Sequence, residues 1–543
     1  MKIISRRTRV VYVTGIFIFL ALVLLYVTIF QLSALKSYVK PFLIPVIKQI
    51  KVWRAGGEDS YLQKVFDGES LDSEKQVPPI KVIETSKLPI VVKYVALPKG
   101  FSQGAGAIAH VRDKLIILSR IGKFYQYQSG IFSEINWPKL PNNIEEYILK
   151  SKGALNSDSL RASSIAFDES EQKIYVGYNK YKTATQNNIV VSSLKIDPVT
   201  LKQVGDWETL FESDLVDTDY GSQAGGGRVI VHQDNIYFSV GYSEHQSISN
   251  GKKVPASQSI NSSLGKVFKI NTITRKIELL SMGHRNVQGM AFTRTGDLLT
   301  SEHGPQGGDE INLIQKGLNY GWPYQTDGTD YGKYSYSSPF EVPPKFISAE
   351  PLYAFVPSMA ISPLHLIKDF HPAWNGDLLL GSLKAQTLFR LVIKSQRVVV
   401  VEPIWIGHRI RDIAIFPKNQ IVLLTDDSFL IFLSVDSDLI KANVKNVGYN
   451  FEPKLARCLV CHHFEISTPV SVAPSLRNIV GRKIGGDTYE KYSSEMKMAS
   501  GVWTKETLSA YISNPQSVVP GTTMPNLGLT SKEVKDIVDF LTK

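Results

Sequence analysis

Residues 289–304, GMAFTRTGDLLTSEHG, show the pattern that decides the fold of most of this chain. Two short apolar runs flank a polar turn, and this arrangement predicts a β-hairpin. The same pattern recurs in RVIVHQDNIYFSVG (228–241) and IAIFPKNQIVLLTDD (413–427). Because hairpins repeat over about 91–440 without helical patterns between them, we expect an all-β closed or radial architecture, most simply a propeller of four-stranded blades.

Length and composition indicate a globular protein with more than one domain. The chain has 543 residues, of which 43% are hydrophobic and 20% are charged; a single hydrophobic core rarely serves so long a chain. The formal net charge of +11 is spread over this length, and no nucleic-acid recognition motif accompanies it. We therefore expect no nucleic-acid partner.

The N-terminus carries a membrane signal. The stretch VVYVTGIFIFLALVLLYVTIF (10–30) is long enough to cross a bilayer as a helix, and Lys2, Arg6, Arg7 and Arg9 precede it. We interpret 1–35 as a cytoplasmic basic tail and transmembrane anchor, with the rest of the chain on the far side of the membrane. A cleaved signal peptide is the alternative, although the apolar stretch is long and no clean Ala-x-Ala site follows. Residues 36–90, rich in proline, are predicted to form a tether with some local helix.

The last hundred residues differ from the rest. Strand patterns end at about residue 443, and WTKETLSAYISNP and SKEVKDIVDFLTK show helical spacing after Thr or Ser N-cap candidates, so 443–543 is predicted to be a small all-α domain. The chain's two cysteines lie here in CLVCH, Cys458 to His462. This is the C-x-x-C-H attachment motif for c-type haem, in which both thiols bind the porphyrin and the histidine binds iron. A redox dithiol lacks its βαβ context here, and a zinc site would need more ligands.

The residues around this motif resemble the small class I cytochromes c with one haem. The match includes Pro474, Leu476, Gly481-Arg482, Trp503, Leu508-x-x-Tyr511-Ile512-x-Asn514-Pro515 and PGTTMP (520–525). The resemblance implies covalent haem c on Cys458 and Cys461, with His462 and Met524 as the two iron ligands. His463 is interpreted as a surface residue. Haem attachment of this kind takes place outside the bacterial cytoplasm, in agreement with the predicted anchor.

A second block of residues stands out in the predicted propeller. GHRNVQGMAF (283–292), SEHGPQGGDEINLI (301–314) and NYGWP (319–323) place glycine and polar groups between strands. The block resembles the aldose and sorbosone dehydrogenases that use pyrroloquinoline quinone (PQQ), which are six-bladed β-propellers with calcium at the quinone. The resemblance implies a PQQ and calcium site with the following residues: Arg285 and Asn286 at the quinone carbonyls in the catalytic position, Gly304 and Pro305 as backbone calcium ligands, and Ser358, Lys384, Arg409 and Arg411 around the cofactor.

The chemistry of these residues suits the assignment. A planar tricarboxylate needs fixed cations, which Lys384, Arg409 and Arg411 would supply, and oxygen ligands suit calcium. Without the resemblance, Arg409 and Arg411 would be interpreted as salt bridges at the rim of the ring. Asp309 could support the metal loop or cap a turn, and the same holds for Glu310. His303 is predicted to lie behind the residues that touch the cofactor.

One departure from the family pattern concerns catalysis. The family has a catalytic histidine four residues before the arginine of a Gly-Arg pair, whereas in GSQAGGGRVIV (221–231) this position, counted from Arg228, is Ala224. The adjacent Gln223 cannot act as a base at neutral pH. Other candidates are Asp217, Asp219, His232 and His245, and spacing supports none of them.

Together these features predict a membrane-anchored quinohaemoprotein dehydrogenase of the bacterial inner membrane, with its catalytic and haem domains in the periplasm. It would oxidise a sugar or another alcohol or aldehyde with PQQ, pass electrons to its own haem, and hand them to a respiratory acceptor. A catalytically inactive, ligand-binding propeller joined to an electron-transfer cytochrome is the alternative. A third hypothesis is that the protein is an electron carrier whose propeller is only structural and binds no quinone.

Overall fold

The protein is described here from a computed structural model. The described residues are 77–98, 106–146, 161–183, 186–217, 225–242, 253–436 and 455–542, with short gaps at 331–332, 334, 417–418, 428, 456–457, 459–460 and 463–472. The predicted anchor (1–35) and most of the predicted tether (36–90) lie outside these ranges. Within the described ranges, no helix combines the length and the apolar character needed to cross a membrane.

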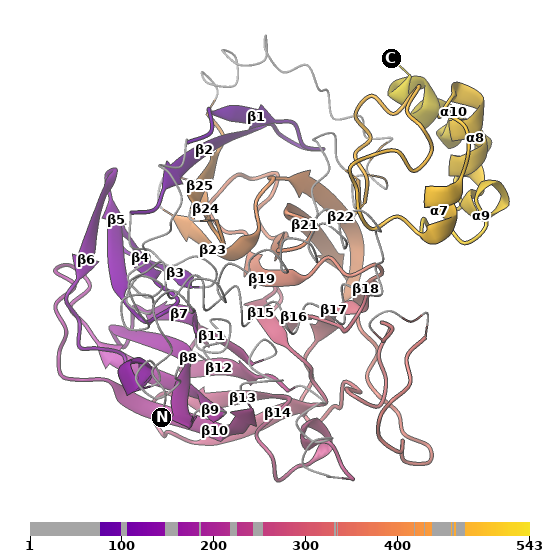
Figure 1. The fold of residues 1–543 in the computed structure, drawn as a ribbon. Coiled ribbons are helices and arrows are strands. Elements are labelled where there is room, and N and C mark those ends of the chain that lie inside the picture. The colour runs from indigo at the N-terminus through magenta and orange to yellow at the C-terminus, as the bar shows by residue number, and fades with distance from the viewer. Residues whose placement is uncertain are drawn as a thin grey trace, which may run out of the picture. The chain divides into compact units, whose positions relative to one another are not determined.

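The β-rich part of the chain is a six-bladed propeller, as expected (Figure 1). Each blade is an antiparallel sheet of consecutive strands. The strands of blades 1 to 3 are β3 (Ala107–Val111), β4 (Lys114–Leu118), β5 (Phe124–Gln128) and β6 (Ile131–Ile135); β7 (Ala162–Asp168), β8 (Lys173–Thr183), β9 (Gln186–Lys195) and β10 (Glu208–Asp217); and β11 (Gly226–His232), β12 (Asn235–Val240), β13 (Lys266–Asn271) and β14 (Ile277–Met282).

Blades 4 to 6 complete the ring, and the last of them is closed by the other end of the chain. Their strands are β15 (Val287–Phe292), β16 (Leu298–Glu302), β17 (Asp309–Leu313) and β18 (Tyr353–Phe355); β19 (Ile361–Leu366), β20 (Leu378–Ser382), β21 (Thr387–Lys394) and β22 (Arg397–Trp405); and β23 (Ile410–Phe416), β24 (Gln420–Thr425), β25 (Phe429–Ser434), β2 (Ile90–Ala96) and β1 (Lys81–Ile83).

The end of the segment predicted to be a tether, 36–90, forms part of blade 6 instead. Strand β2 pairs with β25 along its whole length, and β1, which lies inside the predicted tether, adds a fifth strand to the blade. The N-terminal strands therefore close the ring and cover the edge of β25, which would otherwise be open. The KVI run of β1 is too short to give a strand signal in the sequence. It pairs with β2, which is in turn held by the distant strand β25.

The burial of the strands explains why the sequence pattern is readable. Middle strands such as β20 and β24 are buried on both faces because each blade is packed between two others, so they appear as nearly continuous apolar runs. Outer strands such as β6 alternate with exposed residues. The predicted hairpins in 228–241, 289–304 and 413–427 are confirmed as β11–β12, β15–β16 and β23–β24.

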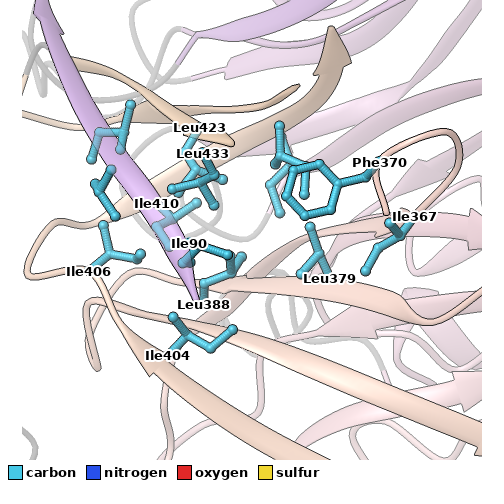
Figure 2. Close-up of a cluster of buried hydrophobic side chains, with 14 of the residues drawn as sticks. Ile90, Ile367, Phe370, Leu379, Leu388, Ile404, Ile406, Ile410, Leu423 and Leu433 are labelled. Carbon is cyan, nitrogen blue, oxygen red and sulfur yellow. The ribbon is translucent and has the colours of Figure 1, made fainter. Parts of the chain in front are cut away.

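Apolar side chains fill the space between neighbouring blades. In Figure 2, Leu379 and Leu388 of blade 5 pack with Leu423 and Leu433 of blade 6, and Ile90 of β2 joins the same cluster. Each of these side chains is fully or almost fully buried. Burial of one such side chain stabilises the fold by about 1.5–3 kcal/mol. This cluster therefore holds the closing blade in the ring.

The C-terminal part is helical. Its helices are α7 (Ser494–Met498), α8 (Lys505–Ser513), α9 (Pro515–Val518) and α10 (Ser531–Leu541). Thr504 and Thr530 cap α8 and α10, each in a capping box that satisfies backbone N–H groups at the first turn. The two helices bury Leu508, Ile512 and Ile537 in a shared core. The two predicted helices are therefore confirmed, with Thr530 rather than Ser531 as the second cap.

Candidate functional sites

The candidate residues of the propeller share one place in the blade pattern. Each lies beside the start of a blade's first strand or just after the end of its second strand, and these two strands are antiparallel neighbours. Both places therefore lie on the same face of the ring. Arg285 and Asn286 precede β15, Gly304 and Pro305 follow β16, Ser358 precedes β19, Lys384 follows β20, Arg409 precedes β23, and Arg411 is the second residue of β23. All eight line one cavity.

Two of the predicted cofactor cations share a carboxylate. The Nε of Arg409 donates to Asp426 at 3.0 Å, and Arg411 donates to the same carboxylate through Nε at 2.7 Å and Nη2 at 2.8 Å. Asp426 follows β24, so it occupies the same place in blade 6 that Lys384 occupies in blade 5. The salt bridges expected without the family resemblance therefore exist, and the same two arginines still line the cavity. The carboxylate fixes their direction, which preorganises them for an anion.

Arg285 is held between a backbone loop and an aromatic ring. Its backbone N–H donates to Glu302 at 3.0 Å, and its Nη1 donates to the carbonyls of Gly304 at 3.0 Å and His303 at 3.3 Å. The guanidinium lies 5.2 Å from the ring centre of Trp322. Its buried Nε has no hydrogen-bond partner among the described residues. A buried donor without a partner costs free energy, so this N–H suits a polar ligand in the cavity.

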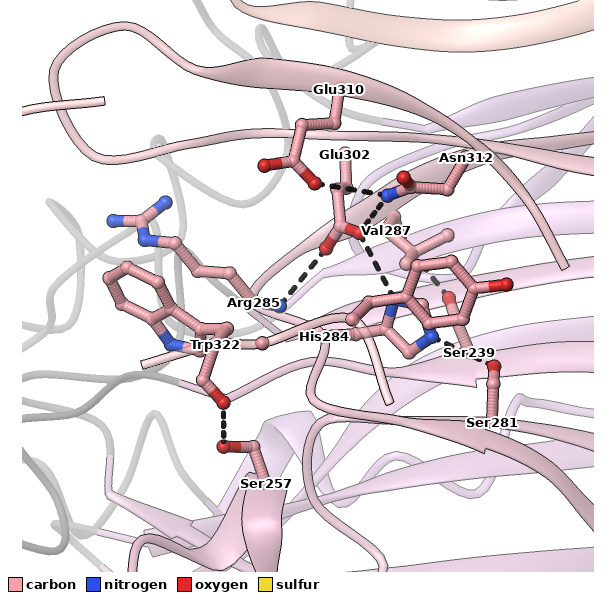
Figure 3. Close-up of polar contacts among 12 residues, drawn as sticks. Ser239, Ser257, Ser281, His284, Arg285, Val287, Glu302, Glu310, Asn312 and Trp322 are labelled. Carbon is pink, nitrogen blue, oxygen red and sulfur yellow. Dashed lines mark hydrogen bonds and ion pairs between the residues drawn. The ribbon is translucent and has the colours of Figure 1, made fainter. Parts of the chain in front are cut away.

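A buried polar network supports Arg285 from behind (Figure 3). His284 is fully buried; its Nε2 lies 2.8 Å from the Ser281 hydroxyl and its Nδ1 lies 3.0 Å from Glu302. Asn312 donates to Glu302 at 2.7 Å and to Glu310 at 3.1 Å. Burial opposes ionisation of Glu302, but His284 and the hydrogen bonds hold its pKa below the usual value. Burial and the facing Glu302 raise the pKa of Glu310 well above its usual value, which favours the neutral carboxyl.

Asp309 organises the loop after β16. Its buried carboxylate accepts from the Gly304 N–H at 3.1 Å, from the Ala360 N–H at 2.6 Å and from the Ser358 hydroxyl at 2.9 Å to each oxygen. The turn-capping role considered for Asp309 is therefore present. The Ser358 hydroxyl is used in this bond, and the residue still contributes to the cavity wall.

His303 lies in the cavity wall rather than behind it. The residue lines the cavity, and its buried Nε2 has no hydrogen-bond partner within the described part of the chain. Burial lowers the pKa of His303 to about 4, so the ring is neutral at pH 7. The prediction that His303 lies behind the residues that touch the cofactor is therefore wrong, because His303 is itself part of the cavity wall.

The backbone carbonyls of Gly304 and Pro305, the predicted calcium ligands, suit a cation less well than Arg409 and Arg411 suit an anion. The Gly304 carbonyl already accepts from the Arg285 guanidinium, so calcium at this oxygen would need that positive charge to move. Among the described residues, no group of three His, Cys, Asp or Glu side chains could hold a metal ion. Calcium at Gly304 and Pro305 stays a prediction.

The helical part brings its predicted haem ligands together. Cys458, Cys461, His462 and Met524 all line a cavity. The Cys461 and His462 N–H groups both donate to the Cys458 carbonyl, at 3.2 and 2.9 Å, and this turn places both thiols and the imidazole on one side. The His462 Nδ1 lies 2.8 Å from the Pro474 carbonyl, so Nδ1 carries the proton and Nε2 is left for iron.

Burial and the neighbouring Cys458 raise the pKa of the Cys461 thiol to about 11, so this thiol is protonated at neutral pH.

The loop that carries Met524 is fixed by hydrogen bonds. The Tyr511 hydroxyl lies 2.6 Å from the Thr522 hydroxyl, and Gln516 donates to the Thr522 carbonyl at 2.7 Å. Gln516 also accepts from the Gly521 N–H at 3.0 Å. These contacts from α8 and α9 hold the Pro-Gly-Thr-Thr-Met turn, so the Met524 thioether is positioned before any ligand binds.

Comparison with known proteins agrees with the two halves of this description. Residues 161–431 match the family model described as Glucose / Sorbosone dehydrogenase. Aldose sugar dehydrogenase YliI of Escherichia coli is 28% identical over 268 residues, which are 45% of this chain and 66% of that protein. Cytochrome c2 of Rhodomicrobium vannielii is 35% identical over 91 residues, which are 17% of this chain and 73% of that protein. This chain joins a glucose/sorbosone dehydrogenase domain to a cytochrome c domain.

A solved structure shows the same fold for the dehydrogenase domain. The soluble aldose sugar dehydrogenase from Escherichia coli, in its apo form, covers 64% of this chain and 100% of its own length, with a TM-score of 0.53 and 23% identity. The cytochrome c homology implies haem, for which the Cys458, Cys461, His462 and Met524 set is chemically suited.

The catalytic base of the dehydrogenase domain is not identified. Ala224, Gln223, Asp219 and His245 lie outside the described residues. His232 ends β11, whereas the cavity face lies at the strand's start, and its ring stacks on Phe292 at 3.9 Å between centres. His232 is therefore not a candidate. Asp217 ends the outer strand β10.

Sequence reasoning missed several cavity residues of the dehydrogenase domain, among them Arg120 and Arg161. Arg120 follows β4 and Arg161 precedes β7, so they occupy in blades 1 and 2 the places that the predicted residues occupy in blades 4 to 6. The signal was present in the hairpin pattern, because each residue flanks an apolar strand at the same point of its blade. It could not be read without a count of the blades.

Proposed function

We propose that this chain is a quinohaemoprotein dehydrogenase, in which the propeller binds PQQ and oxidises a sugar or another alcohol or aldehyde, and the cytochrome c domain receives the electrons. The observation that carries the proposal is the wall of the propeller cavity, which Lys384, Arg409 and Arg411 share with the Arg285 Nε–H and the His303 Nε2. Neither of these two nitrogens has a hydrogen-bond partner among the described residues. This donor set suits a planar polyanion with carbonyl groups. The family match and the cytochrome homology support the same function.

The roles of the chain's own residues follow from their contacts. Arg409 and Arg411 would bind carboxylates while Asp426 holds their direction, and Lys384 would add a point charge. Arg285, fixed by Trp322 and the Gly304 carbonyl, would donate to a carbonyl oxygen. Bound PQQ would supply the hydride-accepting carbonyl, and haem c would accept single electrons.

The location of the protein is part of the proposal. We propose that residues 1–35 anchor the chain in the inner membrane, with the dehydrogenase and cytochrome domains in the periplasm. The apolar run at 10–30 and the four cations before it support this orientation. An anchored pair of domains would deliver electrons near a respiratory acceptor. Protection of the tagged C-terminus from added protease in spheroplasts, in which the outer membrane has been opened, would contradict a periplasmic location.

Visible spectroscopy of the purified full chain tests the function. Spectra are recorded as isolated, after addition of PQQ with calcium, and after addition of a panel of aldoses, with chelator-treated protein as the control. We expect haem reduction that requires both PQQ and a sugar. A c-type spectrum that never responds, with no PQQ bound, would contradict the dehydrogenase.

A binding protein remains the second candidate, and Ala224 is the observation that favours it. A general base contributes about 10² to 10⁴ in rate, so its absence would leave a propeller that binds ligand without turnover. PQQ and sugar binding without haem reduction would support this alternative.

A further inference from the structure

We propose that Lys266 is a positioning residue for the propeller site: its buried ammonium holds the loop that fixes Trp322, and Trp322 in turn fixes the Arg285 guanidinium. This inference rests on the proposed function, because Arg285 is the residue assigned to a carbonyl oxygen of PQQ. Lys266 is a buried cation that the PQQ assignment does not use.

Lys266 is the first residue of β13, in blade 3, and its side chain is fully buried. Its Nζ donates to the carbonyls of Ala256 at 3.0 Å, Ser257 at 2.8 Å and Leu264 at 2.8 Å. An ammonium has three N–H donors and no acceptor, so each donor has a partner. A buried charge is costly unless hydrogen bonds compensate it, and here all three acceptors come from one loop, 256–264. Lys266 therefore ties both ends of this loop to one point.

Two side chains of the loop hold the backbone of Trp322. The Ser257 hydroxyl and the Gln258 Nε2 each donate to the Trp322 carbonyl at 2.7 Å, and Figure 3 shows the bond from Ser257. Gln258 also exchanges two hydrogen bonds with the Asn319 side chain, at 3.2 and 2.6 Å. Because the Ser257 carbonyl binds Lys266, this single residue links the lysine to Trp322.

Trp322 restricts the side chain of Arg285. The buried ring of Trp322 lies 5.2 Å from the guanidinium, whose Nη1 donates to the Gly304 carbonyl at 3.0 Å. Figure 3 shows the Arg285 side chain alongside this ring. A long side chain loses rotamer freedom when it binds a ligand, so a wall that restricts it beforehand raises affinity. If the loop moved, Arg285 would be less restricted and would bind a ligand carbonyl more weakly.

The positive charge of Lys266 is needed for all three hydrogen bonds, because a neutral amine has only two N–H groups. Burial lowers the pKa of Lys266 to about 7, and the Asp214 carboxylate of β10 acts in the opposite direction. The residues paired with Lys266 on β12 and β14, Val240 and Met282, are uncharged. We therefore expect the loop to be held less firmly as pH rises through about 7.

Titration of the full chain with PQQ tests the inference. In Lys266→Met we expect PQQ affinity at about pH 6 to fall about 10-fold, because a directional contact to a ligand carbonyl is weakened. Lys269→Met is the matched control, since Lys269 lies on the same strand and pairs with Glu278 at 3.0 Å. Ser257→Ala removes one bond to Trp322 but keeps Lys266, so it should lower the affinity in the same direction even if Lys266→Met folds poorly. Unchanged PQQ affinity in Ser257→Ala and in folded Lys266→Met would overturn the inference.

The pH profile separates positioning from a purely structural role. The ratio of the PQQ affinities of the parent chain and Lys266→Met should be largest at about pH 6 and should shrink by about pH 8.5, where the parent has lost the charge. His284, which lies behind Arg285, is present in both chains, so its titration cancels in the ratio. A ratio that does not change with pH would contradict the role of the ammonium.

Fluorine NMR of the full chain without PQQ keeps this inference distinct from the proposed function. The chain is labelled with 5-fluorotryptophan, the haem is kept reduced, and Trp322→Phe assigns the Trp322 signal. We expect this signal to shift in Lys266→Met and to stay in place in Lys269→Met. If the signal shifts but PQQ binds neither chain, Lys266 holds the loop and the dehydrogenase fails. If PQQ binds the parent chain and Lys266→Met equally, the dehydrogenase stands and the inference fails.

Discussion

The cytochrome c domain and the propeller encode their sites in opposite ways. In the cytochrome domain, Cys458, Cys461 and His462 lie within five consecutive residues, and one turn brings them together. In the propeller, the cavity collects residues between Arg120 and Asp426 from five of the six blades, with the largest share from blade 4. The first site depends on a local turn, whereas the second depends on closure of the ring. Substitutions should therefore affect the two sites independently.

The largest expected effect is loss of the local site. The double substitution Cys458→Ser and Cys461→Ser should abolish covalent haem, because serine cannot form the thioethers, while PQQ binding by the propeller persists. The pyridine haemochrome spectrum of denatured, solvent-extracted protein measures the change. His463→Ala is the matched control and should keep the c-type spectrum. Haem that stays attached in the serine variant would refute the assignment of the motif.

The next effect concerns closure of the ring. Arg228 of β11 and Asp412 of β23 form a buried salt bridge of 2.7 Å between blades 3 and 6, and Asp412 also accepts the Ile108 N–H of blade 1 at 2.9 Å. Asp412→Asn leaves Arg228 buried without its partner, so we expect a loss of about 3–5 kcal/mol in the free energy of unfolding of the propeller. Urea unfolding followed by tryptophan fluorescence measures it.

Two observations keep this test specific to the propeller. The exposed Asp113→Asn should change stability by no more than about 0.5 kcal/mol. Haem absorbance in the same titration should keep its own midpoint in Asp412→Asn, because the helical core contains neither residue. A shift of the haem midpoint as large as the propeller's would show that the two domains unfold together.

A smaller effect is expected for a substitution that weakens PQQ binding by the propeller without destabilising its fold. Arg411→Gln removes one cation while Arg409 keeps Asp426, so we expect PQQ affinity to fall about 10- to 100-fold with little loss of stability. Titration of the full chain with PQQ measures the affinity, and Arg397→Gln, at the exposed start of β22, is the control. Unchanged PQQ affinity in Arg411→Gln would mean that the Asp426 salt bridge is its only role.

The same contrast decides how much could be predicted from the sequence. The haem-attachment motif, the helices α8 and α10, and the Thr504 cap of α8 were predicted because each depends on residues close in the chain. The hairpins were predicted from alternating apolar runs. Pairing of β1 with β2 escaped because a three-residue strand has no pattern of its own, and because β2 is itself held by β25, more than 300 residues away.

The propeller site was predicted only through the family resemblance. Nothing local in Arg120 or Arg161 indicates a cavity, since each is a lone cation beside a strand. The burial of His303 was missed for the same reason: its surroundings include Asp309, Arg285 and Arg411, which ring closure brings together. A distributed site needs the blade count before its residues can be aligned with one another.

The smallest expected effect tests the network behind Arg285 by its pH dependence. Because burial and Glu302 raise the pKa of Glu310 above that of the unfolded chain, near 4.5, both states are protonated at lower pH. As pH rises above 4.5, the unfolded state ionises first and stability falls, until the raised pKa is passed. Glu310→Gln removes this loss. We expect its melting temperature to exceed that of the parent chain by about 2–4 °C at pH 8, with the difference closing towards pH 4.5.

Glu278 provides a control of opposite sign. Hydrogen bonds from Lys316 and Lys269 lower its pKa to about 2, so its contribution is present above pH 4.5 and is lost as pH falls through about 2. Glu278→Gln should therefore be slightly less stable than the parent chain at pH 7, and this small deficit should shrink in acid. Differential scanning calorimetry across pH measures both variants. A Glu310→Gln curve that followed the Glu278→Gln curve would mean that Glu310 is ionised in the folded protein and that the network carries a second charge behind Arg285.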